Sequence, residues 1–160
     1  MKDPIYVAVA SFITAYARKY IIESAQTVRD WSLQKYGFDA WVYGDTDSQH
    51  VLIDEADVPE LAKFMEIDDY KLGAWKLESK FQRGKYLRQK CYIEQDYDGE
   101  IHSTVAGLPK TLSHLLNFEN FKVGFTTADF SPEEIGEKGK LTNKYVRGGV
   151  VLVDTDFTIN

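Results

Sequence analysis

The sequence predicts an α+β protein, in which an antiparallel sheet packs on one long helix and a small mixed subdomain follows and ends in a β-hairpin. Three observations favour this class. A long stretch near the N-terminus has apolar residues at helical spacing, two apolar runs flank a glycine–aspartate turn directly after it, and strand-like runs recur to the end of the chain. With 160 residues, 44% of them apolar, the chain suits one domain, or one domain with a small appendage.

The first element is predicted to be a helix from about Val7 to Lys35, closed by Gly37 at the C′ position. A helix of about 28 residues is ~42 Å long and can cover a domain face. It has more apolar positions than one packed face requires, so a homodimer of the chain through this surface is expected. The positions at three- and four-residue steps are Phe12, Ile13, Tyr16, Tyr20, Ala25, Val28 and Trp31.

The stretch from Trp41 to Ile53 is predicted to form a β-hairpin around Gly44–Ser48. Side chains alternate along a strand, so Asp45 and Asp47 are expected to project to the same side. Two carboxylates held close together repel each other unless a cation lies between them, and their oxygens suit Mg²⁺ or Mn²⁺. The spacing alone favours an acidic hairpin tip in water.

The tripeptide Asp-Thr-Asp occurs a second time, at 154–156, so its presence at 45–47 is by itself weak evidence for a metal site. The second copy falls within the predicted terminal hairpin, 148–159, and is interpreted as a turn.

The elements after the first hairpin are predicted from shorter signals. Asp57 and Glu60 have the spacing of a capping box for a short helix. The run 86–93 has strand composition, with Tyr86, Arg88, Lys90 and Tyr92 on one face and Leu87, Gln89, Cys91 and Ile93 on the other. Asp98-Gly99 predicts a type I′ turn into a returning strand, 100–105.

A change of composition at 106–109 suggests a subdomain boundary. Beyond it, a helical turn around Leu112 and a short helix capped by Asn117 are expected. The polar stretch 126–145 is predicted to be a mobile loop, although Ser131–Glu134 carries a capping signature.

Composition excludes several classes of protein. One cysteine rules out an internal disulfide, and three dispersed histidines without cysteine partners argue against structural zinc. No apolar run approaches the ~18 residues of a membrane span. Neither an EF-hand nor a phosphate-binding loop is present, and Cys91, on an apolar strand face, is not expected to act as a nucleophile.

Charge is unevenly distributed along the chain. The net charge is −6, yet residues 76–90 carry six basic side chains against one acid, a local charge of +5. Cations beside phenols on one strand face suit phosphates, sugars and bases. Together with a carboxylate pair they point to metal-assisted phosphoryl transfer on a nucleic-acid end, whereas a solvated sheet face is the plain alternative.

Tyr43-Gly44-Asp45-Thr46-Asp47-Ser48 resembles the Y-x-D-T-D-S motif of family B DNA polymerases, and Lys90-Cys91-Tyr92 resembles the K-x-Y motif of their protein-primed members. Further stretches look like the replicative polymerases of small protein-primed bacteriophages. These are Phe12–Ala15, Tyr86–Lys90, Phe118–Phe125 and Gly148–Asp154, so the resemblance runs nearly end to end and in order.

This resemblance implies roles for particular residues. Asp45 and Asp47 would be catalytic carboxylates of the palm and would hold Mg²⁺ or Mn²⁺ between a dNTP and the primer 3′-hydroxyl. Lys90 and Tyr92 would hold the primer strand. DNA contacts are also implied for Tyr43 and Arg88, and Gly44 stands where the family varies, so little is expected to depend on it.

The resemblance also implies an organisation and partners. Residues 1–105 would be the C-terminal part of the palm and 106–160 the thumb. The partners would be primer–template DNA, dNTPs, a terminal priming protein and the rest of a polymerase, in the cytoplasm of a bacterial host, with no membrane.

Three motifs of such polymerases are missing from the sequence: the D-x-x-S-L-Y-P motif with the third catalytic aspartate, the fingers motif and the acidic exonuclease motifs. We therefore expect the 160 residues to be inactive alone as a DNA-directed DNA polymerase. The competing hypothesis is a non-catalytic, clamp-like DNA-binding module derived from a polymerase.

Overall fold

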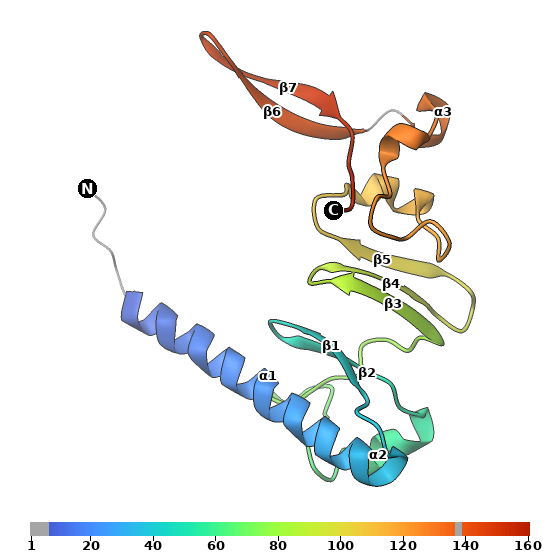
Figure 1. The fold of residues 1–160 in the computed structure, drawn as a ribbon. Helices are drawn as coiled ribbons and strands as arrows, with labels where there is room; N and C mark the ends of the chain where they lie inside the picture. The colour runs from blue at the N-terminus through green and yellow to red at the C-terminus, as the bar shows by residue number, and fades with distance from the viewer. Residues whose placement is uncertain (1–6, 137–138) are drawn as a thin grey trace. The chain divides into compact units, whose positions relative to one another are not determined.

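The computed structural model describes residues 7–136 and 139–160. The chain forms two compact units, unit 1 (Met1–Glu78) and unit 2 (Ser79–Asn160), each described by itself below (Figure 1). The predicted α+β class is confirmed: the described residues contain helices and three antiparallel sheets, ordered β1-β2, β3-β4-β5 and β6-β7. The units divide before β3, and the palm–thumb boundary at 105/106 stays a prediction.

Helix α1, Val7–Tyr36, confirms the predicted long helix. Gly37 ends it with a φ of 79°, and its N–H donates to the Leu33 carbonyl at 3.2 Å, as expected of a C′ glycine. Only the second half of α1 contributes buried residues, which include Val28 and Trp31. In unit 1 this half packs on the first hairpin and on Leu61.

The first half of α1 is exposed along its length. Phe12 and Tyr16 are 67% and 70% exposed, far more than aromatic side chains in a core. The prediction of surplus apolar positions on this helix is thus confirmed, and the homodimer expected from them stays a prediction. Among the helices of residues 7–136 and 139–160, none is long and apolar enough to cross a membrane.

The predicted hairpin consists of β1, Trp41–Asp45, and β2, Ser48–Val51, paired antiparallel. After it come a 3₁₀ turn, Glu55–Asp57, and the one-turn helix α2, Val58–Leu61. The core of unit 1 joins α1 to this part of the chain through Val28, Trp31 and Leu61. Side chains that are partly buried against it are Tyr36, Trp41, Val51, Ile53 and Met65.

The capping box predicted for α2 is wrong. Asp57 makes no side-chain cap hydrogen bond, because its carboxylate accepts from the Tyr36 hydroxyl and pairs with Lys35 at 2.7 Å. Glu60 also pairs with Lys35 and accepts from the Trp31 indole N–H at 3.4 Å. Both carboxylates therefore tie α2 to the end of α1 instead of capping their own helix.

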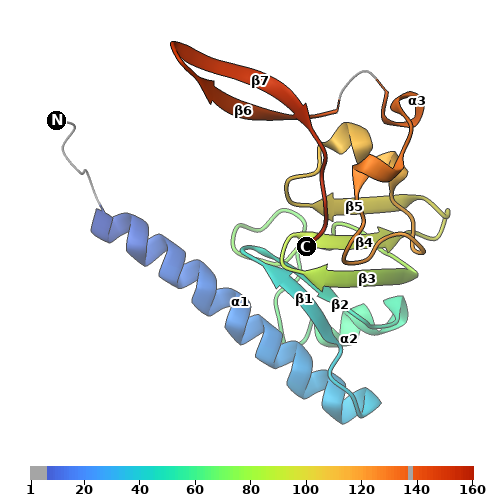
Figure 2. The same ribbon diagram turned by 45° about the horizontal axis from the view of Figure 1, so that its top comes forward.

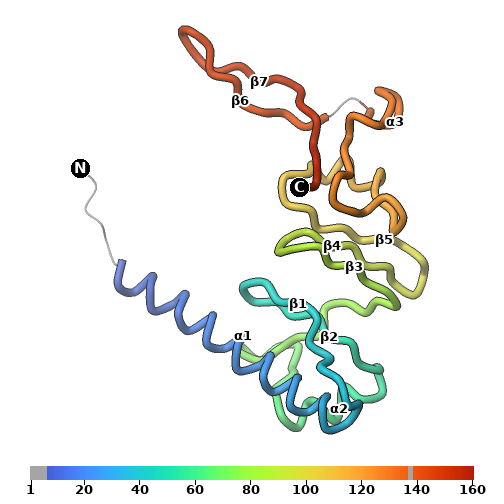
Figure 3. Tube along the Cα trace, in the orientation of Figure 1, coloured from blue at the N-terminus to red at the C-terminus, as the bar shows by residue number. Residues whose placement is uncertain are grey.

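Unit 2 is built on the meander β3, Arg83–Arg88, β4, Cys91–Gln95, and β5, Ile101–Val105, whose strands follow one another as hairpins (Figure 3). One face of this sheet carries the core of the unit, since Cys91 and Ile93 are fully buried with the apolar residues that follow β5. The other buried members are Leu112, Leu115, Leu116, Phe121, Phe125, Phe157 and Ile159.

The segment after β5 is a series of turns. A 3₁₀ helix, Lys110–Leu115, confirms the helical turn expected there. Asn117 does not cap a helix as predicted; its side-chain oxygen accepts from the backbone N–H groups of Glu119 and Asn120, both at 2.9 Å, and closes a turn. The predicted short helix is therefore wrong. Phe121 and Phe125 are buried, as side chains of a helix face would be, but they belong to a stretch of turns and irregular chain.

The stretch predicted as a mobile loop, 126–145, has regular structure where it is described, and its residues 137–138 lie outside the described part of the chain. It contains a 3₁₀ turn, Thr127–Asp129, helix α3, Pro132–Ile135, and most of β6. The capping signature is confirmed, because Ser131 and Glu134 exchange the two hydrogen bonds of a capping box.

The last two strands, β6 (Lys140–Val146) and β7 (Gly149–Thr155), form a two-stranded ribbon (Figure 2). A terminal hairpin was expected within 148–159, but its turn lies at Arg147–Gly148, and Asp154 and Thr155 belong to β7. The second Asp-Thr-Asp is therefore not a hairpin turn. After β7 the chain returns to the core, where the Gly124 N–H donates to the Ile159 carbonyl at 2.7 Å.

Candidate functional site

The β1–β2 hairpin carries Asp45 at the end of a strand and Asp47 in a two-residue turn. Asp45 pairs with Ser48, so Thr46 and Asp47 are the two turn residues. The Asp47 N–H donates back to the Asp45 carbonyl at 2.6 Å. Strand alternation therefore does not extend across this motif, and the expectation that it orients both aspartates was wrong.

Thr46 has a φ of 54°, in the left-handed region that β-branched residues rarely adopt. Its hydroxyl donates to the Asp45 carboxylate at 3.0 Å, and the Ser48 hydroxyl donates to the Asp45 carbonyl at 3.1 Å. Asp45 is half-buried and held by local donors, whereas Asp47 is exposed. A strained turn that displays a carboxylate is a common feature of functional sites.

The donor set of this hairpin suits a hard divalent cation, since carboxylate oxygens are the ligands that Mg²⁺ prefers. Within the part of the chain that the structure describes, neither aspartate belongs to a cluster of three or more metal-ligating side chains. That Asp45 and Asp47 are metal ligands therefore stays a prediction from the sequence.

Tyr43, expected to lie beside DNA, is only 8% exposed. Its ring meets the edge of His50, its partner across the hairpin, with 5.2 Å between the ring centroids. Tyr43 thus contributes mainly to the packing of the hairpin that carries Asp45.

Gly44 lies directly beside the ring of another residue of its strand. A β-carbon built on it would lie 2.7 Å from Cζ2 of the Trp41 indole and 3.4 Å from Cδ1 of Ile21. The indole of Trp41 therefore fills the space beside the strand at Gly44. A shallow hollow of about 450 Å³ lies between α1 and β1 next to both residues, and Thr46 also lines it.

The basic stretch forms a hairpin instead of the single strand predicted for 86–93. Arg88 pairs with Cys91 across a two-residue turn, Gln89–Lys90. Lys90 has a φ of 55°, and its carbonyl accepts from the Ala106 N–H at 2.7 Å. The exposed Lys90 side chain therefore stands at the tip of a hairpin and does not share a strand face with Tyr92.

Arg88 follows a bulge between Tyr86 and Arg88 in β3 and is exposed. Burial raises the pKa of the Cys91 thiol, and the adjacent Arg88 guanidinium offsets part of this effect. A buried thiol with a raised pKa is a packing residue, in agreement with the prediction that Cys91 is not a nucleophile.

Tyr92 lies on the sheet face opposite the core of unit 2. Across the hairpin it pairs with Tyr86, and their rings stack with 5.4 Å between centroids. The prediction that these two tyrosines share a face is confirmed. They lie on two paired strands, however, and not on the single strand that was predicted. Leu87, Cys91 and Ile93 lie on the core side, as predicted, whereas Gln89, predicted on the same face, is an exposed turn residue.

The predicted site residues therefore form two groups. Tyr43, Asp45 and Asp47 belong to one hairpin of unit 1, and Arg88, Lys90 and Tyr92 to one hairpin of unit 2. Each hairpin has one turn residue with a positive φ. In the first hairpin this residue is Thr46, between Asp45 and Asp47, and in the second it is Lys90 itself.

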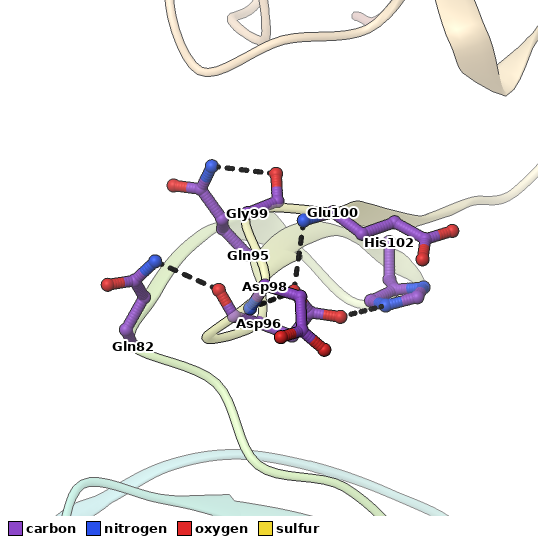
Figure 4. A network of polar contacts seen from close by, with 7 residues as sticks. All are labelled: Gln82, Gln95, Asp96, Asp98, Gly99, Glu100 and His102. Atoms are coloured by element: carbon purple, nitrogen blue, oxygen red, sulfur yellow. Dashed lines mark hydrogen bonds and ion pairs between the residues drawn. The ribbon is translucent and has the colours of Figure 1, made fainter.

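A third polar cluster was missed. Asp96, Glu100 and His102 surround the β4–β5 loop, and their ligand atoms lie within 4.8 Å of one another (Figure 4). The Asp96 carboxylate contacts His102 Nε2 at 3.1 Å and accepts from the N–H groups of Asp98 and Glu100. These partners, His102 foremost, hold the pKa of Asp96 below its ordinary value.

That cluster shapes the loop. The Gly99 N–H donates to the Asp96 carbonyl, the Asp96 N–H donates to the Glu100 carbonyl, and Gly99 has a φ of 91°. These are the features of a three-residue hairpin loop with a left-handed glycine, so the predicted type I′ turn was wrong. An aspartate before Asp-Gly, able to accept from the loop, was the sequence signal for it.

Comparison with known proteins gives one consistent result. No protein-family model matches the chain. Over 99% of its length the chain is 38% identical to a DNA polymerase of Bacillus phage B103 and 37% identical to that of Bacillus phage phi29, and over 98% it is 33% identical to that of Streptococcus phage Cp-1. The chain spans about a quarter of the length of these relatives, 27%, 27% and 24% respectively.

Solved structures agree. Phi29 DNA polymerase complexed with primer-template DNA matches with a TM-score of 0.68 and 37% identity, over 93% of this chain and 25% of that one. The same polymerase with primer-template DNA and incoming nucleotide substrates matches with a TM-score of 0.67 and 36% identity, over 93% and 25%.

Proposed function

We propose that this chain, which corresponds to about a quarter of a phi29-type phage DNA polymerase, supplies part of the polymerisation site of such an enzyme. The observation that carries the proposal is the similarity to phage DNA polymerases over 99% of the chain. Both candidate motifs lie within the matched length, and each is placed at a hairpin turn.

In this proposal Asp45 and Asp47 hold Mg²⁺ or Mn²⁺. Bound there, the ions supply the neutralisation of triphosphate charge and a lowered pKa of the primer 3′-hydroxyl. Asp45 is kept in place by the hydroxyl of Thr46, and Asp47 presents its carboxylate from the turn. The third carboxylate comes from outside these 160 residues, so the chain alone does not catalyse synthesis.

The second half of the proposal concerns the primer strand. Lys90, exposed at the tip of a hairpin, neutralises a backbone phosphate, and Arg88 lies on the same hairpin. Tyr92 offers a phenol that can stack on a sugar or base or donate a hydrogen bond. Tyr43 acts through the packing of the carboxylate hairpin.

We place residues 1–105 in the palm and 106–160 in the thumb of that polymerase. Its remaining parts cover the exposed apolar half of α1, and a dNTP, primer–template DNA and a terminal priming protein are its partners in the cytoplasm of the host bacterium. If the chain is purified alone, the uncovered half of α1 is expected to associate with a second copy. Sedimentation at several concentrations measures this.

A chimera tests the catalytic part. The matching segment of phi29 DNA polymerase is replaced by this chain, and primer extension is measured with Mg²⁺. Asp47→Ala and Asp45→Ala should each lower the rate at least about a thousandfold, because a lost metal ligand removes several kcal/mol of transition-state stabilisation.

The chain offers its own control. Asp154→Ala changes the second Asp-Thr-Asp, which lies at the end of β7, and should leave extension near the parent rate. If the Asp47→Ala chimera still extends primers at the parent rate, the catalytic assignment is wrong. The remaining hypothesis is then a DNA-binding, clamp-like module. Template-directed synthesis by the 160 residues alone contradicts the proposed incompleteness.

A further inference from the structure

Glu94 is a carboxylate in an unusual place. It lies in β4 and is only 8% exposed. Burying a carboxylate is costly unless a strong donor accompanies it. One such donor is the hydroxyl of Tyr86, which donates a hydrogen bond to Glu94 Oε1.

A glycine makes this contact possible. Gly84 is the strand partner of Glu94, two residues before Tyr86 and therefore on the same face of the sheet. A β-carbon at Gly84 would lie 2.8 Å from Cε2 of Tyr86 and 3.0 Å from its hydroxyl oxygen. The phenol ring of Tyr86 therefore lies over Gly84. In this position its hydroxyl reaches the carboxylate of Glu94.

The same ring stacks on Tyr92. The two ring planes are inclined by 28°. One end of Tyr86 is thus held by a buried carboxylate while its face holds the ring of Tyr92, the tyrosine of the K-x-Y motif. A hydrogen bond has a preferred direction and length, so the contact with Glu94 restricts the Tyr86 ring and through it Tyr92.

We propose that Glu94 and Tyr86 are positioning residues that hold the Tyr92 ring ready for the end of a DNA primer strand. This inference rests on the proposed function. Tyr92 touches the DNA, whereas Glu94 and Tyr86 act behind it, with Gly84 as the residue that leaves room for them. Fixing a side chain in advance removes the cost of ordering it when the ligand binds.

The test uses the full 160-residue chain and two DNA probes, a duplex with a recessed 3′ end and a blunt duplex of equal length and charge. The measured quantity is the ratio of the two dissociation constants, together with the fluorescence of 2-aminopurine as the 3′-terminal base. A general loss of stability alters both affinities alike, whereas loss of positioning alters their ratio.

Tyr86→Phe keeps the ring and removes the hydroxyl, and Glu94→Leu removes the acceptor. Each should lower the preference for the recessed end by about fivefold. Glu94→Gln keeps an oxygen acceptor and should restore most of the preference. Tyr97→Phe, at an exposed tyrosine of the neighbouring loop, is the matched control and should have no effect.

The outcomes separate the two proposals. If Lys90→Ala and Tyr92→Ala weaken binding to the recessed end while Tyr86→Phe and Glu94→Leu leave the ratio unchanged, the positioning role is wrong and the proposed function stands. If Lys90→Ala and Tyr92→Ala have no effect either, both are wrong. Urea unfolding of each variant identifies one that is not folded, and Tyr86→Phe then decides in place of Glu94→Leu.

Discussion

The indole of Trp41 occupies the space that a side chain at Gly44 would need. The two residues lie in the same strand, and a β-carbon at Gly44 would approach the indole to 2.7 Å. The strand that ends at Asp45 is therefore held by a large ring that lies over a glycine.

Gly44→Ala is expected to destabilise unit 1 by about 1–3 kcal/mol, because an added methyl group forces the indole out of its position. Urea unfolding followed by tryptophan fluorescence measures this, since all three tryptophans lie in unit 1. Gly149→Ala is the control, as no atom lies within 4 Å of a β-carbon there. Equal stability of Gly44→Ala and the parent chain contradicts the packing argument, whereas Trp41→Leu should largely rescue the alanine variant.

The link between α1 and α2 should weaken in acid. Side-chain hydrogen bonds from Lys35 hold the pKa values of Asp57 and Glu60 below their ordinary 3.8 and 4.5. The unfolded chain therefore binds more protons in acid, and this contribution to stability, complete above about pH 5, is lost as the pH falls through the lowered values. Urea midpoints between pH 3 and pH 7 measure the slope.

Lys35→Met should flatten that slope, because it removes the cation that lowers both carboxylate pKa values. Lys19→Met removes an exposed i,i+4 pair with Glu23 and should leave the slope unchanged. A slope that Lys35→Met does not alter would assign the acid sensitivity to other carboxylates.

Cys91 should react slowly with thiol reagents in the folded chain. Burial raises the pKa of its thiol and shields the sulfur, so little thiolate is available at pH 8. Alkylation should be at least about a hundredfold slower than in urea, since it requires opening of the unit 2 core. Fast labelling without denaturant is the result that would exclude this packing.

The C-terminal residues should stabilise unit 2 out of proportion to their number. Ile159 is fully buried and its N–H donates to the Phe125 carbonyl at 2.9 Å. Ile159→Ala should cost about 2–4 kcal/mol, as expected for a fully buried aliphatic side chain. Leu152→Ala on the exposed ribbon, where Leu152 is 63% exposed, should change stability little. Similar losses for both variants would contradict the described packing.

Lys90→Gly separates stability from binding. The positive φ of Lys90 is unfavourable for a side-chain-bearing residue, so glycine should stabilise unit 2 by about 0.5–1 kcal/mol. The same variant lacks the ammonium group and should bind DNA more weakly, with a salt dependence reduced by about one phosphate contact. Lys90→Ala shares the loss of binding without the gain in stability. A Lys90→Gly variant that unfolds earlier than the parent chain refutes the strain argument.

Patterns confined to a few neighbouring residues were sufficient to predict several parts of this fold. The apolar repeat of α1 and the glycine after it, the hairpin at 41–51 and the capping box at Ser131 all depend on backbone bonds made within one turn or one hairpin. The carboxylate and K-x-Y motifs were likewise found in short stretches of sequence, through their resemblance to motifs of family B DNA polymerases.

The remaining features depend on partners far along the chain. Asp57 and Glu60 have capping spacing, but Lys35, more than twenty residues away, takes both carboxylates. The turn at Lys90 contains no glycine, proline or asparagine, so no local signal marks it, and its carbonyl is held by Ala106. Glu94 likewise acquires its role from Tyr86 and Gly84 on the neighbouring strand. Local backbone preference is written into short stretches of sequence, whereas competition among distant groups for the same hydrogen bonds and the same space is resolved only when the chain is folded.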